Sequence, residues 1–275
     1  MTHRGWILEN SQKIARLQEV IRKYGKMLIA FSGGVDSSLL LAVAWEVLKD
    51  NVLAVTGVSP IHPKSEIEKA IRFAKSLGVN HRVLPSHEMD LADFLENNPE
   101  RCYFCKKSLV LDLQKIAEAN SIPHIADGSN LDDLKDYRPG FKAAKELGIV
   151  SPLVEAGLTK KDIRNLSKDM GLETWDQPSQ PCLATRLPYG TPITEDVLLK
   201  VARAEAVLSS LGIPVSRVRH HGELARIEVP AEVFQEIMKE EARRLILDKF
   251  REIGYLYIAL DLGGYFQGSM NRAFA

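Results

Sequence analysis

The stretch Phe31–Ser38, with the sequence FSGGVDSS, restricts the possible folds of this chain more than any other. An apolar run, Met27–Phe31, leads into it, and a helical pattern of apolar residues follows over Leu39–Leu48. This order predicts a strand, a tight turn and the start of a helix. Gly33 and Gly34 let the backbone turn sharply and approach a ligand closely. The stretch therefore predicts a ligand-binding loop between a strand and a helix.

The side chains of this loop suit a polyphosphate ligand. Ser32, Ser37 and Ser38 bring hydroxyls to a helix start, where N–H groups without intrahelical partners point at a bound anion. Asp36 adds a carboxylate that can hold Mg²⁺ against that anion. The Lys-Ser/Thr ending of a Walker A loop is missing, and the pattern is not GxGxxG. The plain alternative is a glycine turn that binds nothing.

The wording SGGVDSS resembles the PP-loop of the ATP pyrophosphatase family. In that family, ATP is split between its α and β phosphates and a substrate is adenylated. The resemblance implies that the loop binds ATP through six residues: Ser32, Gly33, Gly34, Asp36, Ser37 and Ser38.

Buried runs alternate with helical patterns along the first part of the chain. Strands are predicted at Met27–Phe31, Val52–Val58, Arg82–Pro85 and Ile122–Ala126. Helices are predicted at residues 10–24, 39–48, 64–77, 141–147 and 159–170. A further long helix is predicted to follow Cys105 and to end at Ala119. Such alternation predicts an α/β fold with a parallel sheet, in which ligands bind beyond the carboxyl ends of the strands. We assign residues 1–190 to a PP-loop ATP pyrophosphatase domain of the adenine nucleotide alpha hydrolase-like type.

The pattern changes after about residue 192. A helix is predicted over Glu195–Leu211, followed by strands over Val215–His220 and Ala225–Val229. A helix over residues 231–253 and a last strand, Tyr255–Leu260, complete the chain. We assign residues 191–275 to a smaller α+β domain that binds substrate or mediates oligomerisation.

Composition narrows the classes of partner. The 275 residues carry 36 Lys and Arg against 36 Asp and Glu, and a strong nucleic-acid binder would show a basic excess. No apolar run approaches the ~20 residues of a membrane span. The N-terminus has no apolar signal core and reads as an amphipathic helix. We expect a cytoplasmic protein without a membrane or nucleic-acid partner.

The three cysteines, Cys102, Cys105 and Cys182, leave several interpretations open. A closed zinc site needs four ligands, so it would need a residue such as His124 besides the thiols. Three thiolates suit a [4Fe-4S] cluster with one iron left open, which could carry a hydrosulfide. The thiols can also be unrelated, or Cys182 alone can donate sulfur as a thiolate activated by Arg186.

Three further sets of polar residues are candidates for ligand contacts. Asp127 and Gly128 follow a predicted strand at the same sheet edge as the PP-loop, where Asp127 binds magnesium or nucleotide, or forms an Asx turn. Arg138, before a Pro-Gly pair, is a candidate substrate contact. Arg217 and Arg219 share one face of a predicted strand, where two guanidiniums form a phosphate-sized fork.

The alternative for this strand region is an exposed, salt-bridged sheet face, with Arg226 and Glu228 on the next strand. His220 and His221 are expected to be solvent-exposed turn residues.

Several stretches resemble the LarE family: SGGVDSS, DGSNLDDLKDYRPG, SPLVEAGLTKKDIRNLSKDMGL, QPCLATRLPYGTPIT and RVRHHGELARIEVP. The resemblance covers nearly the whole chain. It implies an ATP-dependent sulfur transferase that converts the carboxylates of pyridinium-3,5-biscarboxylic acid mononucleotide to thiocarboxylates, for the nickel-pincer cofactor of lactate racemase. One version of the family sacrifices the sulfur of a single cysteine. The other holds a [4Fe-4S] cluster that carries an extra sulfide.

Cys102, Cys105 and Cys182 resemble the second version, because the sacrificial route needs one cysteine and no CxxC. We expect Mg²⁺ at Asp36 and attack of cluster-bound sulfide on an acyl-adenylate. The arginines of the tail are expected to hold the substrate's 5′-phosphate, and Arg186 its carboxylates. Two glutamates, Glu205 and Glu228, are expected to add a metal or substrate contact. Family members form homo-oligomers, which predicts a trimer or hexamer, and a separate molecule must supply sulfide.

Rival interpretations remain at this stage. A tRNA thiolase of the same superfamily also uses three cysteines, but the balanced charge speaks against tRNA. An NAD or GMP synthetase would need free ammonia or a partner, because no glutaminase domain is visible. A regulatory nucleotide-binding module would bind ATP without releasing pyrophosphate.

Overall fold

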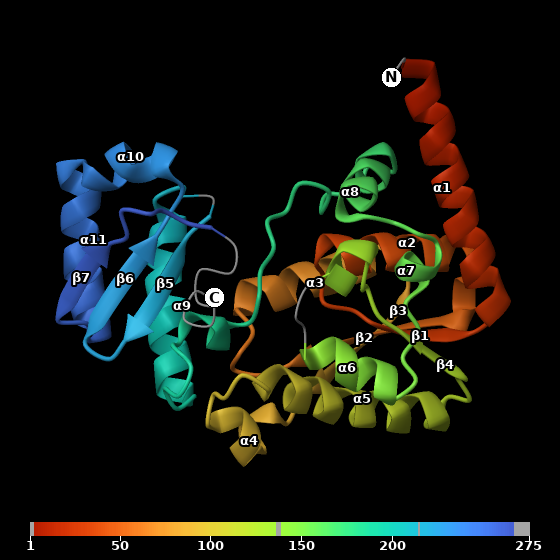
Figure 1. The fold of residues 1–275 in the computed structure, drawn as a ribbon, viewed down its shortest axis with the longest axis horizontal. Helices are drawn as coiled ribbons and strands as arrows, with labels where there is room; N and C mark the ends of the chain where they lie inside the picture. The colour runs from red at the N-terminus through yellow and green to blue at the C-terminus, as the bar shows by residue number, and fades with distance from the viewer. Residues whose placement is uncertain (1–2, 136–138, 214, 267–275) are drawn as a thin grey trace. The chain divides into compact units, whose positions relative to one another are not determined.

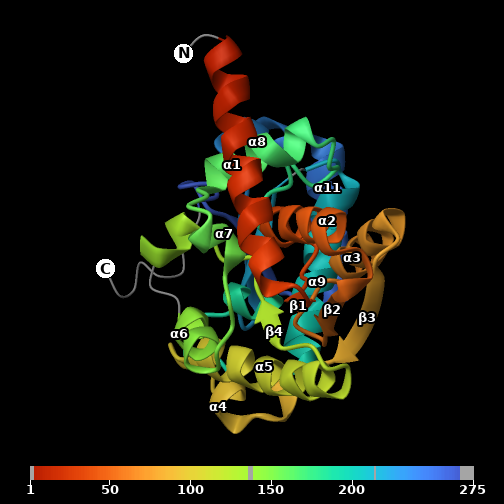
Figure 2. The ribbon, with the colours of Figure 1, turned by 90° about the vertical axis from the view of Figure 1, so that its right-hand side faces the viewer.

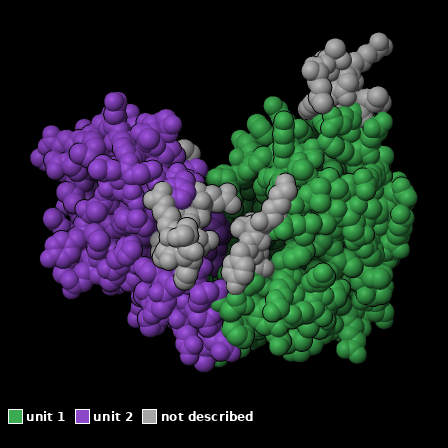
Figure 3. Space-filling model, viewed as in Figure 1, with its two compact units in different colours: residues 1–91, 100–180 green, residues 92–99, 181–275 purple. Residues whose placement is uncertain are grey.

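The computed structural model describes residues 3–135, 139–213 and 215–266 (Figure 1). The chain forms two compact units (Figure 3). Unit 1 comprises Met1–Leu91 and Glu100–Gln180, and unit 2 comprises Ala92–Pro99 and Pro181–Ala275. No helix within the described part of the chain is long and apolar enough to cross a membrane.

A parallel sheet forms the centre of unit 1 (Figure 1). Its strands lie in the order β3-β2-β1-β4 and are β1 Met27–Ala30, β2 Val52–Val58, β3 Asn80–Pro85 and β4 His124–Ala126. All three pairings between neighbours are parallel. This confirms the α/β class predicted for this part of the chain.

Helices cover both faces of this sheet. They are α1 His3–Tyr24, α2 Val35–Leu48, α3 Lys64–Leu77, α5 Arg101–Ala119, α6 Pro139–Glu146, α7 Pro152–Glu155 and α8 Lys160–Asp169. Short 3-10 turns are η1 Lys49–Asn51, η2 Glu88–Asp90 and η3 Leu131–Lys135. Figure 2 shows α5 and α6 on one side of the strands and α1 and α2 on the other.

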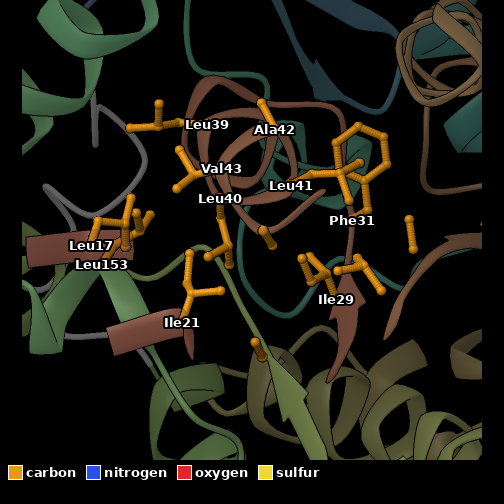
Figure 4. Close-up of a cluster of buried hydrophobic side chains, with 14 of the residues drawn as sticks. Leu17, Ile21, Ile29, Phe31, Leu39, Leu40, Leu41, Ala42, Val43 and Leu153 are labelled. Atoms are coloured by element: carbon orange, nitrogen blue, oxygen red, sulfur yellow. The ribbon is translucent and has the colours of Figure 1, made fainter. Parts of the chain in front are cut away.

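The two faces follow from the alternation of side chains along each strand. Met27 and Ile29 of β1 belong to the apolar core that includes α1, α2 and α8, part of which is shown in Figure 4. Leu28, between them, belongs to a second core with Leu113 and Ala117 of α5. Strand β1 is thus buried on both sides, which explains its continuous apolar sequence.

Helices α1, α2 and α5 of unit 1 begin before the residues expected for them. Helix α1 begins at His3 and not at residue 10. Helix α2 begins at Val35, four residues before the expected Leu39, because the polar residues of its first turn, Asp36 among them, interrupt the apolar pattern. Helix α5 begins at Arg101, so Cys102 and Cys105 lie in a helix and not in the loop expected before it.

Unit 2 is the expected smaller α+β unit, built on a sheet of order β5-β6-β7. The strands are β5 Arg217–His221, β6 Leu224–Glu228 and β7 Tyr257–Leu260. The first pair is antiparallel and the second is parallel. The helices are α4 Ala92–Leu95, α9 Glu195–Ser210, α10 Phe234–Met238 and α11 Glu240–Ile253, with 3-10 turns η4 Leu183–Arg186 and η5 Ala231–Val233.

Two expectations for unit 2 are wrong. The single helix expected over residues 231–253 is divided, because Lys239 has the extended angles φ −57° and ψ 140° between α10 and α11. His220 is buried and not a solvent-exposed turn residue: its ring Nδ1 lies 3.2 Å from the hydroxyl of the buried Tyr255. His221, at the end of β5, is exposed as expected.

The unit boundary differs from the expected division at residues 190 and 191. Residues 92–99 join unit 2 because Asn97, fully buried, donates hydrogen bonds of 2.8 Å to the carbonyls of Pro188 and Thr191. The backbone N–H of Ile193 donates to the carbonyl of Leu95 over 2.8 Å. These contacts form between segments about ninety residues apart, so no local pattern could reveal them. Cys182 and Arg186 consequently belong to unit 2.

The turn after β1 depends on a glycine. Gly33 has φ +76°, and a Cβ atom added to it would lie 2.8 Å from the Cβ of Ala70 on α3. Both the left-handed backbone and the close approach of α3 therefore require a residue without a side chain. Gly25 has a similar φ of +66°, but no atom lies within 4 Å of its added Cβ.

We predict that Gly33→Ala destabilises unit 1 more than Gly25→Ala does. Both variants pay about 1 kcal/mol for a left-handed L-residue. Gly33→Ala adds an overpacking cost of about 1–3 kcal/mol against α3. The measurement is urea unfolding followed by tryptophan fluorescence, since Trp6, Trp45 and Trp175 all belong to unit 1. Equal midpoints for the two variants would contradict the contact with Ala70.

We predict that Asn97→Ala loosens the 188–193 segment of unit 2. Loss of two hydrogen bonds to buried carbonyls costs about 1–3 kcal/mol. Faster hydrogen exchange at Gly190 and Ile193, whose N–H groups bond to the carbonyls of Asn97 and Leu95, is the readout. Asn98→Ala is the matched control, with an expected effect within about 0.5 kcal/mol. Unchanged exchange in Asn97→Ala would remove this residue as the anchor.

Candidate functional site

The candidate site of unit 1 lies at β1, from which later strands are added to the sheet on both sides. From β1 the chain crosses to β2 on one side, and β4 later pairs on the other side of β1. Crossovers leaving a strand on opposite sides open a crevice beyond the carboxyl ends of the two strands. The PP-loop follows β1 and Asp127-Gly128 follows β4, so both candidate segments border this crevice.

Gly128 and the start of α2 approach each other closely. A Cβ atom added to Gly128 would lie 2.9 Å from the backbone N of Ser37. The approach is possible because glycine has no side chain. The structure therefore brings together two segments that are about ninety residues apart in the sequence, as expected.

The PP-loop is held by its own hydroxyls. Ser37 Oγ donates to the carbonyl of Gly34 over 3.1 Å and lies 3.1 Å from Ser32 Oγ. Gly34 is the N-cap of α2 and has no side chain to satisfy the first N–H groups of the helix. These groups are available to an anion, as the sequence suggested. Ser38 differs from the other loop serines, because its side chain is fully buried.

Asp36 is a carboxylate with one oxygen paired and one not. Its Oδ2 accepts a hydrogen bond of 2.5 Å from Nζ of Lys160, the first residue of α8. Its Oδ1 is buried without a hydrogen-bond partner among the described residues. Burial raises the pKa of Asp36 above its usual value, and the ammonium of Lys160 opposes that rise. A buried carboxylate oxygen without a donor is a suitable ligand for Mg²⁺.

Asp127 is buried, and both of its carboxylate oxygens have partners. Its Oδ1 accepts from the backbone N–H of Ser129 over 3.1 Å and from Ser151 Oγ over 2.9 Å. Its Oδ2 lies 3.2 Å from Nζ of Lys106 on α5. Burial alone raises the pKa of Asp127, but Lys106 and the hydrogen bonds outweigh it, so the pKa lies below the usual value. The bond to Ser129 is the Asx turn that the sequence left open, and it keeps the carboxylate ionised beside the crevice.

The CxxC lies beside this edge. Cys102, exposed, and Cys105, half-buried, are three residues apart on α5 and therefore share one side of the helix. Lys106, the next residue, contacts Asp127, and the backbone of Gly140 approaches the carbonyl of Cys102. The first turns of α5 thus border the carboxyl ends of the strands.

His124 cannot complete a zinc site with the CxxC. It begins β4, just after α5 ends, and its ring stacks edge-on against Tyr24 at 4.9 Å. A helix rises about 1.5 Å per residue, so the length of α5 separates His124 from Cys102 by roughly 25 Å. Within unit 1 as described, no third Cys, His, Asp or Glu is grouped with the two cysteines. Cys182, the third cysteine of the sequence, belongs to unit 2.

Cys182 lies on a tightly bonded turn of unit 2. It is half-buried and immediately precedes η4. Its carbonyl accepts from the backbone N–H of Thr185 over 3.0 Å, from Thr185 Oγ1 over 2.8 Å and from Nη1 of Arg186 over 3.1 Å. These three donors fix the backbone that carries the thiol.

Arg186 is fully buried and bonds within unit 2. Its Nε and Nη2 donate to the two carboxylate oxygens of Glu205 over 2.9 and 3.0 Å. Its Nη1 also donates to the carbonyl of Pro181 over 2.6 Å. Glu205 in turn accepts from the backbone N–H of Val218 in β5 over 3.1 Å. Arg186 and Glu205 therefore tie the Cys182 turn to the sheet.

Arg217 and Arg219 extend this polar cluster, both nearly fully buried. The Arg217 guanidinium lies 5.2 Å from the ring centre of Tyr265. Burial lowers the pKa of Arg217, and the neighbouring charges of Arg186 and Arg219 lower it further. Arg219 donates to Oε2 of Glu228 through Nε and Nη2, over 2.9 and 2.7 Å.

Ion pairs connect this cluster to carboxylates. Arg226 bonds to Glu228 over 3.2 Å and to Asp261 over 2.7 Å. Among the described residues, the guanidiniums of residues 186, 219 and 226 thus pair with the carboxylates of residues 205, 228 and 261. The face is salt-bridged, as one interpretation of the sequence held, but it is buried and not exposed.

Some site residues escaped sequence reasoning. Lys160 was not among the predicted site residues. A signal for it was present: a Thr-x-x-Asp capping box marks the start of a helix, and the helix dipole disfavours a lysine there. Buried Glu88 was missed too: it accepts from Ser59 and Ser86, which follow β2 and β3 at the same sheet edge. Arg138, a predicted substrate contact, lies outside the described residues.

Comparisons with known proteins show which sequences this chain is similar to. The NAD synthase family matches residues 10–122. An uncharacterized protein of Synechocystis is 43% identical over 94% of this chain and 97% of its own length. An uncharacterized protein of Methanocaldococcus jannaschii is 30% identical over 92% of this chain and 97% of its own length.

A further relative is similar across both units. The pyridinium-3,5-bisthiocarboxylic acid mononucleotide synthase of Lactiplantibacillus plantarum is 36% identical over 94% of this chain and 94% of its own length. The aligned region includes the PP-loop and Asp127-Gly128 of unit 1, and the Cys182 turn and the arginine cluster of unit 2. The chain therefore belongs to the family of this synthase, the LarE family.

Proposed function

We propose that this chain is an ATP-dependent sulfur transferase that converts the carboxylates of pyridinium-3,5-biscarboxylic acid mononucleotide to thiocarboxylates. The observation that carries the proposal is the PP-loop, placed against Asp127-Gly128 at the β1/β4 crevice, in a chain so similar to the synthase. The product serves nickel-pincer cofactor biosynthesis.

The chemistry explains the need for ATP. A carboxylate is a poor electrophile, because the oxygen that would have to leave is a strong base. A carboxylate oxygen of the substrate attacks the α-phosphorus of ATP, the bond to the β-phosphate oxygen breaks, and pyrophosphate leaves. A sulfur nucleophile then forms a bond to the activated carbon, and AMP leaves with the bonding electrons. Each carboxylate needs one ATP.

The PP-loop residues hold the phosphates during the first step. The N–H groups at the start of α2 and the hydroxyls of Ser32 and Ser37 face the departing pyrophosphate. Oδ1 of Asp36 is the oxygen that would hold Mg²⁺, which would offset phosphate charge. Asp127, kept ionised by its partners, fixes the backbone of Gly128 against the loop.

Cysteine chemistry fits a [4Fe-4S] cluster with three protein ligands. Cys102 and Cys105 supply two thiols from one side of α5, and Cys182 supplies the third from a fixed turn. The cluster, when bound, supplies sulfur that an external sulfide source can replenish. The surroundings of Cys182 support a precise position for its thiol.

The arginine cluster of unit 2 is proposed to bind the 5′-phosphate of the substrate. Arg217 and Arg219 provide the guanidiniums, whose planar forks of N–H donors match the oxygens of a phosphate. Arg186 and Glu205 position the Cys182 turn through their paired hydrogen bonds. Glu228 orients Arg219. Arg138 is kept as a candidate substrate contact.

The direct test is turnover with ATP, the pyridinium substrate and sulfide after anaerobic purification. We expect pyrophosphate and AMP to form with the thiocarboxylate, over many turnovers. Asp36→Asn should lower pyrophosphate release about a hundredfold or more, because transition-state charge loses its stabilisation. Asp50→Asn, an exposed carboxylate after α2, is the matched control. ATP binding without pyrophosphate release in the wild type would instead indicate a regulatory module.

The cysteines are tested by iron and sulfide analysis together with turnover. Cys102→Ser, Cys105→Ser and Cys182→Ser should each lose the cluster and with it all thiocarboxylate formation, because the cluster supplies the sulfur. Tyr103→Phe, between the two cysteines of α5, should keep both. Full iron in Cys102→Ser would contradict the three-thiol ligand set. A wild type that turns over once and leaves Cys182 without its sulfur would establish the sacrificial route instead.

A further inference from the structure

Lys160 places a cation directly on the carboxylate proposed to hold Mg²⁺. Its Nζ lies 2.5 Å from Oδ2 of Asp36, and no other described residue accepts a hydrogen bond from this ammonium. The second oxygen of Asp36 is buried and has no donor in the described part of the chain. The pair thus satisfies only one oxygen of a carboxylate that has room for another ligand.

The position of Lys160 in α8 is electrostatically unfavourable by itself. It is the first helical residue, where the helix dipole disfavours a positive charge. Two contacts nevertheless fix its backbone there: its N–H donates to Asp132 over 2.9 Å, and Thr159 caps the helix in a capping box with Asp162. The backbone is therefore held rigidly while the side chain extends to Asp36.

A second cation on the same helix behaves differently. Arg164, one turn later, donates to the carbonyls of Trp175 and Gln177 over 2.8 and 2.7 Å. These two hydrogen bonds hold the Arg164 guanidinium in place, so it is not the cation that changes its partner when a ligand binds. Lys160 has a flexible stem, a single acceptor and a side chain that is 35% exposed, so it can leave Asp36 once another cation takes over the carboxylate.

We propose that Lys160 supplies the positive charge beside Asp36 when nucleotide is absent, and moves to the phosphates when ATP and Mg²⁺ bind. The inference rests on the proposed role of Asp36 as the metal ligand. An ammonium and a divalent cation on one carboxylate repel each other, so the metal alone must displace Lys160. A polyphosphate offers the ammonium new acceptors, which lets metal and nucleotide enter together.

This arrangement predicts two effects of opposite sign for Lys160→Gln. Removing the ammonium strengthens the binding of metal alone, because its competitor is gone. It also weakens the binding of nucleotide without metal, because a phosphate partner is gone. A lysine that only stabilises the fold would produce neither pattern.

The first measurement is a Mn²⁺ titration followed by electron paramagnetic resonance, without nucleotide. Lys160→Gln should bind Mn²⁺ at least about tenfold more tightly than the wild type, a typical coupling between linked sites. Lys160→Arg should resemble the wild type, and Asp36→Asn should lose the site. Lys161→Gln, an exposed neighbour, is the matched control and should change nothing. Equal Mn²⁺ affinities in Lys160→Gln and wild type would overturn the proposal.

The second measurement is ATP binding by calorimetry in the presence of a chelator. Lys160→Gln should bind metal-free ATP about tenfold more weakly, and Lys161→Gln should match the wild type. Unchanged affinity in Lys160→Gln would overturn the transfer of Lys160 to the phosphates. Lys160→Met, which keeps the apolar stem, replaces Lys160→Gln if that variant does not fold. Pyrophosphate release by the wild type is measured separately, so failure of the sulfur-transferase function is distinguishable from failure of this inference.

Discussion

The parallel pairing of β1 with a strand on each side is the constraint on which unit 1 depends. Because β2 and β4 both pair with β1, the loops after β1 and β4 meet at one edge. Glycine is required at two points near this edge. Gly33 turns the chain beneath α3, and Gly128 approaches the first turn of α2. The N–H groups at the start of α2 and the hydroxyls of the PP-loop lie at this edge, where we propose that ATP binds.

Charge is distributed differently in the two units. In unit 1, single carboxylates border the crevice, each with one lysine: Asp36 with Lys160, and Asp127 with Lys106. In unit 2, guanidiniums and carboxylates interlock in a buried network, which removal of one partner would leave with an uncompensated charge. The first arrangement permits exchange of a cation during nucleotide binding. The second keeps the Cys182 turn and the arginine side chains in a fixed geometry.

The arrangement of the cysteines follows the same contrast. Cys102 and Cys105 come from α5, whose next residue, Lys106, forms an ion pair with Asp127. Cys182 comes from a turn that Arg186 and Thr185 hold by its carbonyl. Activation of a carboxylate and delivery of sulfur are thus assigned to different, separately stabilised segments.

The sequence by itself determined the strand-turn-helix around Gly33 and Gly34, the parallel sheet and the change to an α+β unit. These depend on local periodicity and on glycine geometry, which a single chain displays directly. It also singled out Asp36 and the cysteines, because their residue types carry the chemistry. Pairing between distant segments was decided only by the tertiary structure. Asn97 joined unit 2 through carbonyls about ninety residues away, and Lys160 reached Asp36 across 124 positions, because long-range hydrogen bonds leave no periodic trace in the sequence.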